Sequence, residues 1–196
     1  MKKRKWLFLL LIIPLISIII IIKFRYEYIP SSDEIIEEIK ATKGYKAKVN
    51  YLFINQKSKY SENAVIYYSE DSCNKIQFEN GIEEKYIDED IEIKGEQKLY
   101  KIDKELYDTY SLAFVEKIMK NKVLNISEDS EEWGEIEYIN IEMLLKGNNE
   151  NINKANLYID KKNKVPIMIR VFDRNNKLRI VIKFEEFQYL DNIEKR

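Results

Sequence analysis

Histidine is absent from the sequence, and cysteine, proline and glycine are scarce, with one, three and five residues. Without imidazole the chain cannot form a Ser-His-Asp triad, use a histidine general base or bind zinc through histidine. The single cysteine, Cys73, cannot form an internal disulfide. No cysteine lies near the end of the N-terminal apolar segment, which excludes lipoprotein processing there. These absences predict a chain without a metal or other cofactor.

Carboxylates are the catalytic groups that remain. A glycosidase holds two of them across a cleft with a defined gap. Here they come in short acidic runs typical of solvated turns, at residues 83–84, 88–90, 128–129 and 131–132. The run at 88–90 also lacks the glycine and the ligand spacing of an EF-hand calcium loop. We therefore predict that the chain is not an enzyme.

One apolar segment, Trp6–Ile22, runs for seventeen residues without a charge. As a helix it is about 25 Å long, at the short end of what spans a bilayer. Four basic residues precede it, and Lys23 and Arg25 follow it. These flanks reach the headgroups and, by the positive-inside rule, place the N-terminus in the cytoplasm. We predict an uncleaved signal anchor that includes Trp6, Leu10 and Ile22.

A cleaved signal peptide is the main alternative for this segment, because a basic start and an apolar core are common to both. Residues 18–23, however, lack the small side chains that a signal peptidase requires. The predicted organisation is a cytoplasmic stub and transmembrane anchor at 1–25, a juxtamembrane linker at 26–31 and one extracytoplasmic domain at 32–196.

The charge of that domain excludes one class of partner. Six of the 33 basic residues lie in the first 25, which leaves 27 against 34 acidic residues and a net charge of about −7. Nucleic acid is not a partner for such a surface, because its phosphates require a basic one.

The domain begins with a helix signal and continues with alternating strands. Ser31 and Glu34 have capping-box spacing, and Gly44 is a natural C-terminal stop, so we predict a helix over 32–43. A second helix is predicted over 110–121, where apolar residues fall on one face. Period-two patterns predict strands at 45–53, 63–69, 75–79, 84–88, 98–102, 136–145, 155–160, 166–172 and 178–187. The fold class is therefore α+β, a long antiparallel sheet with helices on one side.

Aromatic residues mark a candidate partner surface. Tyr67 and Tyr68 are adjacent in a predicted strand, so they point to opposite faces and cannot both enter one core. Tyr110 and Phe114 share a stripe on the second helix, which either covers the sheet or acts as a lid or docking helix. Exposed aromatic surface often marks protein recognition. An unpaired edge strand is a second candidate, for a partner strand or for a homodimer by strand exchange.

Two motifs in the C-terminal third resemble known families. The first resembles the GerS-type germination lipoproteins of spore-forming clostridia, through Gly147, Asn148, Asn149, Asn151, Asn153, Lys154, Ala155, Leu157 and Tyr158. The second resembles the broader LolA/LolB-like lipoprotein-carrier proteins, through Asp160, Val165, Pro166, Asp173, Lys177, Leu178, Phe184 and Phe187.

The LolA-like resemblance implies a curved antiparallel half-barrel with helices on its concave face. The GerS-like resemblance implies a non-catalytic protein that binds and supports the spore-cortex N-acetylmuramoyl-L-alanine amidase. This amidase makes the muramic-δ-lactam needed for spore germination, and the zinc belongs to the amidase. The space between the forespore and mother-cell membranes is one location that this role implies.

The chain departs from the GerS-type pattern at the anchor, because residues 18–23 contain no lipobox cysteine. The tether is then the apolar segment itself. A lipid- or lipoprotein-binding carrier of the cell envelope is the alternative function, and it requires a sizeable apolar cavity. A sensor domain is a third interpretation, for which five residues before the span leave no cytoplasmic signalling domain.

Overall fold

A computed structural model describes nine ranges of the chain: 13–14, 16–21, 30–55, 57–87, 90–95, 99–103, 109–130, 136–147 and 149–190. The chain divides into two compact units, Met1–Ser31 and Ser32–Arg196.

In the first unit, residues 13–14 and 16–21 are helical, and their isoleucines are about half exposed. The predicted anchor residues Trp6, Leu10 and Ile22 lie outside the described residues. No helix within the described ranges has the length and apolar character needed to cross a bilayer. The signal anchor therefore stays a prediction.

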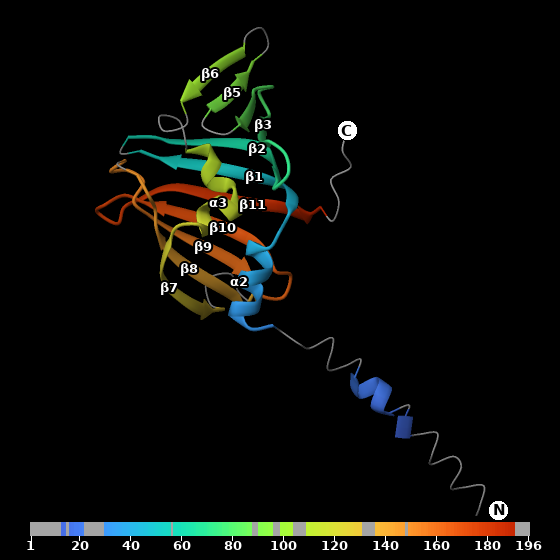
Figure 1. Ribbon diagram of the computed structural model, residues 1–196. Helices are drawn as coiled ribbons and strands as arrows, with labels where there is room; N and C mark the ends of the chain where they lie inside the picture. The colour runs from blue at the N-terminus through green and yellow to red at the C-terminus, as the bar shows by residue number, and fades with distance from the viewer. Residues whose placement is uncertain are drawn as a thin grey trace, which may run out of the picture. The chain divides into compact units, whose positions relative to one another are not determined.

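The second unit is built on one antiparallel sheet of eleven strands in the order β6-β5-β4-β3-β2-β1-β11-β10-β9-β8-β7 (Figure 1). Every neighbouring pair is sequential except β1 and β11, which join two meanders at the centre of the sheet. The sheet is open, with β6 and β7 at its edges. The strands are β1 Gly44–Ile54, β2 Lys59–Ser69, β3 Asn74–Phe78, β4 Glu83–Ile87, β5 Asp90–Lys94, β6 Leu99–Asp103, β7 Lys122–Asp129, β8 Tyr138–Leu144, β9 Lys154–Asp160, β10 Val165–Phe172 and β11 Leu178–Tyr189.

Alternation of apolar and polar residues decides which face of the sheet is buried. In β1, Tyr45, Ala47, Val49 and Tyr51 are at most 1% exposed, whereas the residues between them are partly or fully exposed. The buried side of this alternation continues through the neighbouring strands into one core cluster. We call this side the inner face and the opposite side the outer face.

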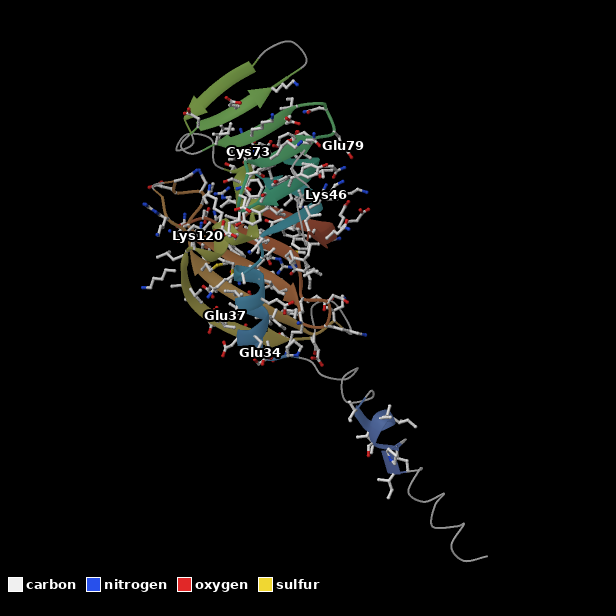
Figure 2. All side chains as sticks on the ribbon, turned by 45° about the vertical axis from the view of Figure 1, so that its right-hand side comes forward. Glu34, Glu37, Lys46, Cys73, Glu79 and Lys120 are labelled. Carbon is white, nitrogen blue, oxygen red and sulfur yellow. The ribbon has the colours of Figure 1, made fainter. Side chains whose placement is uncertain are left out.

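Three short helices lie on the inner face, α2 Ser32–Lys40, η1 Tyr110–Ala113 and α3 Val115–Met119 (Figure 1). Ile35, Ile36 and Ile39 of α2 belong to the same core as the sheet. The acidic residues of α2, including Glu34 and Glu37, are exposed on its other side (Figure 2). The α+β class, the antiparallel sheet and the placement of helices on one face are as predicted.

The first helix is shorter than predicted. It ends at Lys40, not at residue 43, and Gly44 begins β1 instead of terminating the helix. The reason is register, because Gly44 already pairs with Ser69 of β2, so the three residues before it must turn the chain.

The second predicted helix is broken in two. Phe114 has an extended backbone with a ψ of 104°, which ends η1 and begins α3. The Phe114 side chain packs edge-on against Tyr86 of β4, with ring centroids 5.3 Å apart. Packing of this ring into the sheet therefore overrides the helical pattern of residues 110–121.

Candidate interaction surface

The segment formed by η1 and α3 packs its side chains against the inner face of the sheet. The hydroxyl of Tyr45 accepts a 2.9 Å hydrogen bond from the backbone N–H of Val115, and the hydroxyl of Tyr51 donates one of 2.9 Å to the carbonyl of Tyr110. Val115 and Ile118 are 2% and 0% exposed. This packing places side chains of η1 and α3 where a carrier would hold an acyl chain, and so weighs against the carrier alternative.

The four aromatic residues proposed as a partner surface do not form one surface. Tyr68 and Phe114 are 6% and 2% exposed in the inner-face core, so neither is available to a partner in this structure. Tyr110 is partly buried beside them, with its hydroxyl 2.7 Å from Oε2 of Glu62. Tyr67 alone lies on the outer face, because it is out of phase with Tyr68.

A buried carboxyl group lies within the inner-face core. Glu84 is 2% exposed, and its Oε2 accepts a 2.7 Å hydrogen bond from the Tyr86 hydroxyl. Loss of solvation raises the pKa of the Glu84 carboxyl, and the nearby charge of Glu62 adds to the rise. Burial therefore destabilises the charged form of Glu84. Its hydrogen-bond donor Tyr86 packs against Phe114, the residue between η1 and α3.

Three of the exposed large apolar residues of the domain lie close together on one edge strand of the sheet, whereas Tyr60, Ile87 and Ile136 are exposed elsewhere. Val123, Leu124 and Ile126 of the edge strand β7 are 40%, 47% and 41% exposed, and the neighbouring Leu144 of β8 is 39% exposed. Val123 and Ile126 lie opposite the inner-face residues Met143 and Ile141, whereas Leu144 is out of phase with Met143 and lies on the outer face. We call Val123, Leu124 and Ile126 the β7 edge patch. Because β7 pairs with β8 alone, its other side presents backbone groups that no strand within the described ranges pairs with.

Both ends of β7 are held by side-chain contacts. At its start, Asn121 donates to the carbonyl of Ile118 at 2.9 Å and accepts from the backbone N–H of Lys146 at 3.0 Å. At its end, Glu128 accepts from Lys161 at 2.7 Å and from the Ser32 hydroxyl of α2. A bulge in the pairing with β8 lies at Leu124, the third residue of the strand. The edge is therefore a preformed strand with three exposed apolar side chains, held at both ends by side-chain contacts.

The motif residues that carried the family resemblance hold turns and strand pairs together. Gly147 has a φ of +135°, a conformation that favours glycine, while Asn148 lies outside the described residues. The Asn149 side chain accepts from the N–H of Asn151, and the N–H of Asn153 donates to the carbonyl of Phe172. These residues shape the β8–β9 connection.

The rest of the motif is structural as well. Lys154 pairs with Glu142 of β8 at 2.9 Å, Ala155 is fully buried, and Pro166 lies near the start of β10. Asp173 is 3% exposed in the β10–β11 turn, where it accepts from the N–H groups of Asn175 and Lys177 and from Arg179. Hydrogen bonds from Lys177 and then from Arg179 hold the pKa of this carboxyl below its ordinary value.

No group of three or more metal-binding side chains occurs among the described residues. Cys73 is exposed and unpaired by disulfide in a turn between β2 and β3. Sequence reasoning missed the β7 edge patch altogether, because the segment 122–129 follows directly on the second helix and alternates poorly. The sequence signal for it was the apolar pair Val123–Leu124 followed by Ile126, but the end of an apolar helix would show the same pattern.

Comparison with known proteins identifies one matching family and several solved structures with a similar fold. The model of the family described as sporulation protein YdcC-like matches residues 2–196. No curated protein matches the chain. An uncharacterised conserved protein from Thermus thermophilus has a TM-score of 0.54 at 13% identity, over 84% of this chain and 90% of that chain.

Two further solved structures are similar to the chain. One is the CwlD amidase of Clostridioides difficile in complex with the GerS lipoprotein, with a TM-score of 0.48, 16% identity and coverage of 84% and 99%. The other is a LolA superfamily protein from Nitrosomonas europaea, with a TM-score of 0.47, 9% identity and coverage of 84% and 96%. The predicted resemblance to a family of sporulation proteins is borne out by the family model, and the likeness to solved structures concerns the fold alone.

Proposed function

The chain belongs to the family of YdcC-like sporulation proteins, and from this premise we propose that it is a non-catalytic, membrane-anchored partner of a cell-wall amidase. Its role is to bind and support the spore-cortex N-acetylmuramoyl-L-alanine amidase that makes muramic-δ-lactam. The choice of an amidase follows the sequence resemblance at residues 147–158. The sequence has no histidine, so the zinc of such a complex belongs to the partner.

The observation that carries the proposal is the β7 edge patch. Fixed strands with an uncovered apolar edge bind a partner in two ways at once, through backbone hydrogen bonds along the edge and through side-chain contacts. An aliphatic side chain that passes from full exposure to full burial contributes roughly 1.5–3 kcal/mol, and a partly exposed one contributes the corresponding fraction. Val123, Leu124 and Ile126 are each at least 40% exposed, so they still have apolar surface to bury.

The membrane tether is the second part of the proposal. The segment Trp6–Ile22 holds the domain on the outer side of the membrane, with the basic residues before it in the cytoplasm. A tethered domain faces the wall, where an amidase acts on peptidoglycan. Protease protection of the full chain in sealed vesicles tests this topology, because an extracytoplasmic domain is protected in inverted vesicles and digested in right-side-out ones.

The test of partnership uses the full chain in neutral detergent micelles with the cortex amidase of the same organism. We expect co-elution on size-exclusion chromatography and a gain in amidase activity. Ile126→Lys removes apolar surface at the patch and is expected to weaken binding at least tenfold. Ile87→Lys, at a residue 39% exposed at the end of β4, is the matched control and is expected to bind like the wild type.

Two results would overturn this function. Absence of a complex with the wild-type chain rejects the partnership itself, and equal loss of binding in both variants rejects the β7 edge patch as the surface. Acyl chains found by mass spectrometry in the purified protein would instead favour the lipid-carrier alternative. Homodimer formation by strand exchange stays a prediction, and light scattering on the same sample decides it, because a strictly monomeric mass removes it.

A further inference from the structure

One chemically distinctive dipeptide, Asn80–Gly81, lies in the turn between β3 and β4. Of all the asparagines in the sequence, only Asn80 is followed by glycine. The N–H of Phe78 donates to the carbonyl of Ile82 at 2.9 Å, and the N–H of Gly81 donates to the carbonyl of Phe78 at 3.1 Å. Gly81 has a φ of +84°. The turn is therefore a three-residue hairpin loop that ends in a left-handed glycine.

The dipeptide is open to water. Asn80 and Gly81 are both exposed, and a Cβ added at Gly81 would meet no heavy atom within 4 Å. Figure 2 shows Glu79, the residue before the dipeptide, at the margin of the sheet. Because core packing does not hold this turn, it opens locally at a much lower free energy than the sheet behind it.

Two hydrogen bonds orient the side chain of Asn80. Its Oδ1 accepts from the backbone N–H of Ile82 at 3.0 Å, and its Nδ2 donates to Oε1 of Glu62 at 3.3 Å. The first bond polarises the side-chain carbonyl in the way that an oxyanion donor does, so the Cγ atom is more electrophilic. The second bond is long for an N–H···O pair and restrains Nδ2 only weakly. The next backbone nitrogen belongs to glycine, which has no side chain to obstruct its approach to Cγ.

We propose that Asn80 is a site of spontaneous covalent modification by water, and that its conversion weakens the attachment of η1 to the sheet. In the first step the nitrogen of Gly81 loses its proton to solvent and bonds to Cγ of Asn80, while the Cγ–Nδ2 bond breaks and Nδ2 leaves as ammonia. In the second step water adds to either carbonyl of this cyclic imide and restores the N–H of Gly81. The products are an aspartyl or an isoaspartyl residue, and the net change consumes one water and releases one ammonia.

The local structure controls the rate of the first step. The N–H of Gly81 is bonded to the carbonyl of Phe78, so this bond must open before the nitrogen can attack. Local opening of the exposed turn is sufficient, because the strands on both sides keep their pairing from Gln77 and Glu83 onwards.

The modified residue lies beside the carboxylate that attaches η1 to β2. Oε2 of Glu62 accepts a 2.7 Å hydrogen bond from the hydroxyl of Tyr110, the first residue of η1. Both hydrogen-bond donors to Glu62 among the described residues, Asn80 and Tyr110, are uncharged. Conversion of Asn80 removes one of these donors and places a second negative charge next to Glu62. Repulsion between the two carboxylates then displaces Glu62 and disturbs its bond to Tyr110.

The two products act on the hairpin to different extents. The aspartyl form keeps the backbone of the loop and changes only its charge, because aspartate is as common as asparagine in such turns. The isoaspartyl form adds a backbone carbon to the loop and shifts the pairing of Gln77 with Glu83 as well. Neither change reaches the β7 edge patch, so this inference is independent of the amidase partnership.

The first test follows the reaction in the full chain, held in neutral detergent micelles in warm, mildly alkaline buffer. Peptide mapping by mass spectrometry locates each amide that becomes an acid, and an isoaspartyl methyltransferase labels the isoaspartyl product. Asn175, exposed in the β10–β11 turn but followed by Asn176, is the matched internal control. Asn80 is expected to convert at least about tenfold faster than Asn175, because glycine leaves the attack unobstructed.

The second test measures the effect on η1 without waiting for the reaction. Asn80→Asp introduces the charge of the aspartyl product, and Asn80→Gln is the matched uncharged variant. Hydrogen exchange is followed at the amides of Leu112 and Phe114, which donate to the carbonyls of Thr109 and Ser111. Exchange in Asn80→Asp is expected to be at least about threefold faster than in the wild type, whereas Asn80→Gln should exchange like the wild type.

The outcomes separate the site from its effect. Faster conversion of Asn80 than of Asn175, together with faster exchange in Asn80→Asp alone, supports the proposal. Equal conversion of the two asparagines overturns it, because the turn then confers no reactivity. Conversion of Asn80 with unchanged exchange in Asn80→Asp overturns the link to η1. Equally fast exchange in Asn80→Gln also overturns that link, since added charge is then not the cause.

Discussion

Ile118 and Ile126 are chemically identical, yet the domain uses them in opposite ways. Ile118 of α3 is fully buried between the helix and the inner face, whereas Ile126 of β7 is 41% exposed at the edge of the same sheet. Ile126 lies opposite the fully buried Ile141, so it continues the apolar layer of the core beyond the reach of the helices. The apolar layer of the sheet therefore extends beyond the region that the helices cover. The apolar side chains left exposed at the β7 edge are available to a partner.

The largest expected effect is on the buried member of this comparison. Ile118→Ala leaves a cavity beneath the cover of the inner face and should lower the free energy of unfolding by about 3 kcal/mol. Thermal unfolding followed by circular dichroism should show a midpoint roughly 10 °C lower. A shift below about 2 °C would contradict the interpretation of η1 and α3 as an integral part of the core.

A smaller effect, of opposite sign, is expected at Glu84. Burial raises its pKa in the folded protein, so above the ordinary value of 4.5 the unfolded chain releases this proton more readily. Stability therefore falls as pH rises from 4.5 towards the folded pKa. Glu84→Gln should raise the unfolding midpoint at about pH 7 and leave it unchanged at about pH 4. Equal midpoints at both pH values would show that the site tolerates the charge.

Asp173, in the β10–β11 turn, should make the stability of the fold depend on pH in the opposite direction. Its folded pKa lies below the ordinary value of 3.8 because Lys177 and Arg179 donate hydrogen bonds to its charged form. Its stabilisation is complete above about pH 4 and is lost as pH falls through the folded pKa. In Asp173→Asn the midpoint at about pH 7 should be lower, and the decline between about pH 4 and pH 2 shallower. An unchanged slope would contradict this assignment.

The smallest effect on stability is expected at the exposed member of the comparison. Ile126→Lys should change the free energy of unfolding by less than about 0.5 kcal/mol, as surface substitutions do. The same variant is the one expected to lose the amidase. Urea unfolding measures the first quantity and chromatography of the mixture the second. A large loss of stability would place Ile126 in the core and end the contrast with Ile118.

Much of the fold could be predicted because the burial of β strands is visible in the alternation of their residues. Alternation in β1 and β11 placed both strands and their inner faces from the sequence alone. Two strands were missed for physical reasons. Strand β5 has only five residues, and it begins at the last residue of the acidic run 88–90. Strand β7 is an edge strand whose side chains are almost all exposed, so its sequence shows no alternation of apolar and polar residues.

The interaction surface was harder to predict than the fold. The rule that adjacent strand residues face apart placed Tyr67 and Tyr68 on opposite sides, but it could not say which face the helices cover. Phe114 was misplaced because its exposure depends on the break between η1 and α3, which tertiary packing imposes. The β7 edge patch depends on which strand ends the sheet, and that is a property of topology.

The pairing of β1 with β11 joins the two ends of the domain sequence at the centre of the sheet, and it has a consequence for folding. Each meander consists of contacts between strands close in sequence, which form early, whereas the joint between them connects Tyr45 with Tyr189. A chain that emerges N-terminus first exposes the edge of β1 until residues 178–189 have arrived. We therefore expect the two halves to exist first as separate sheets with unpaired edges, and the pairing of β1 with β11 to form last.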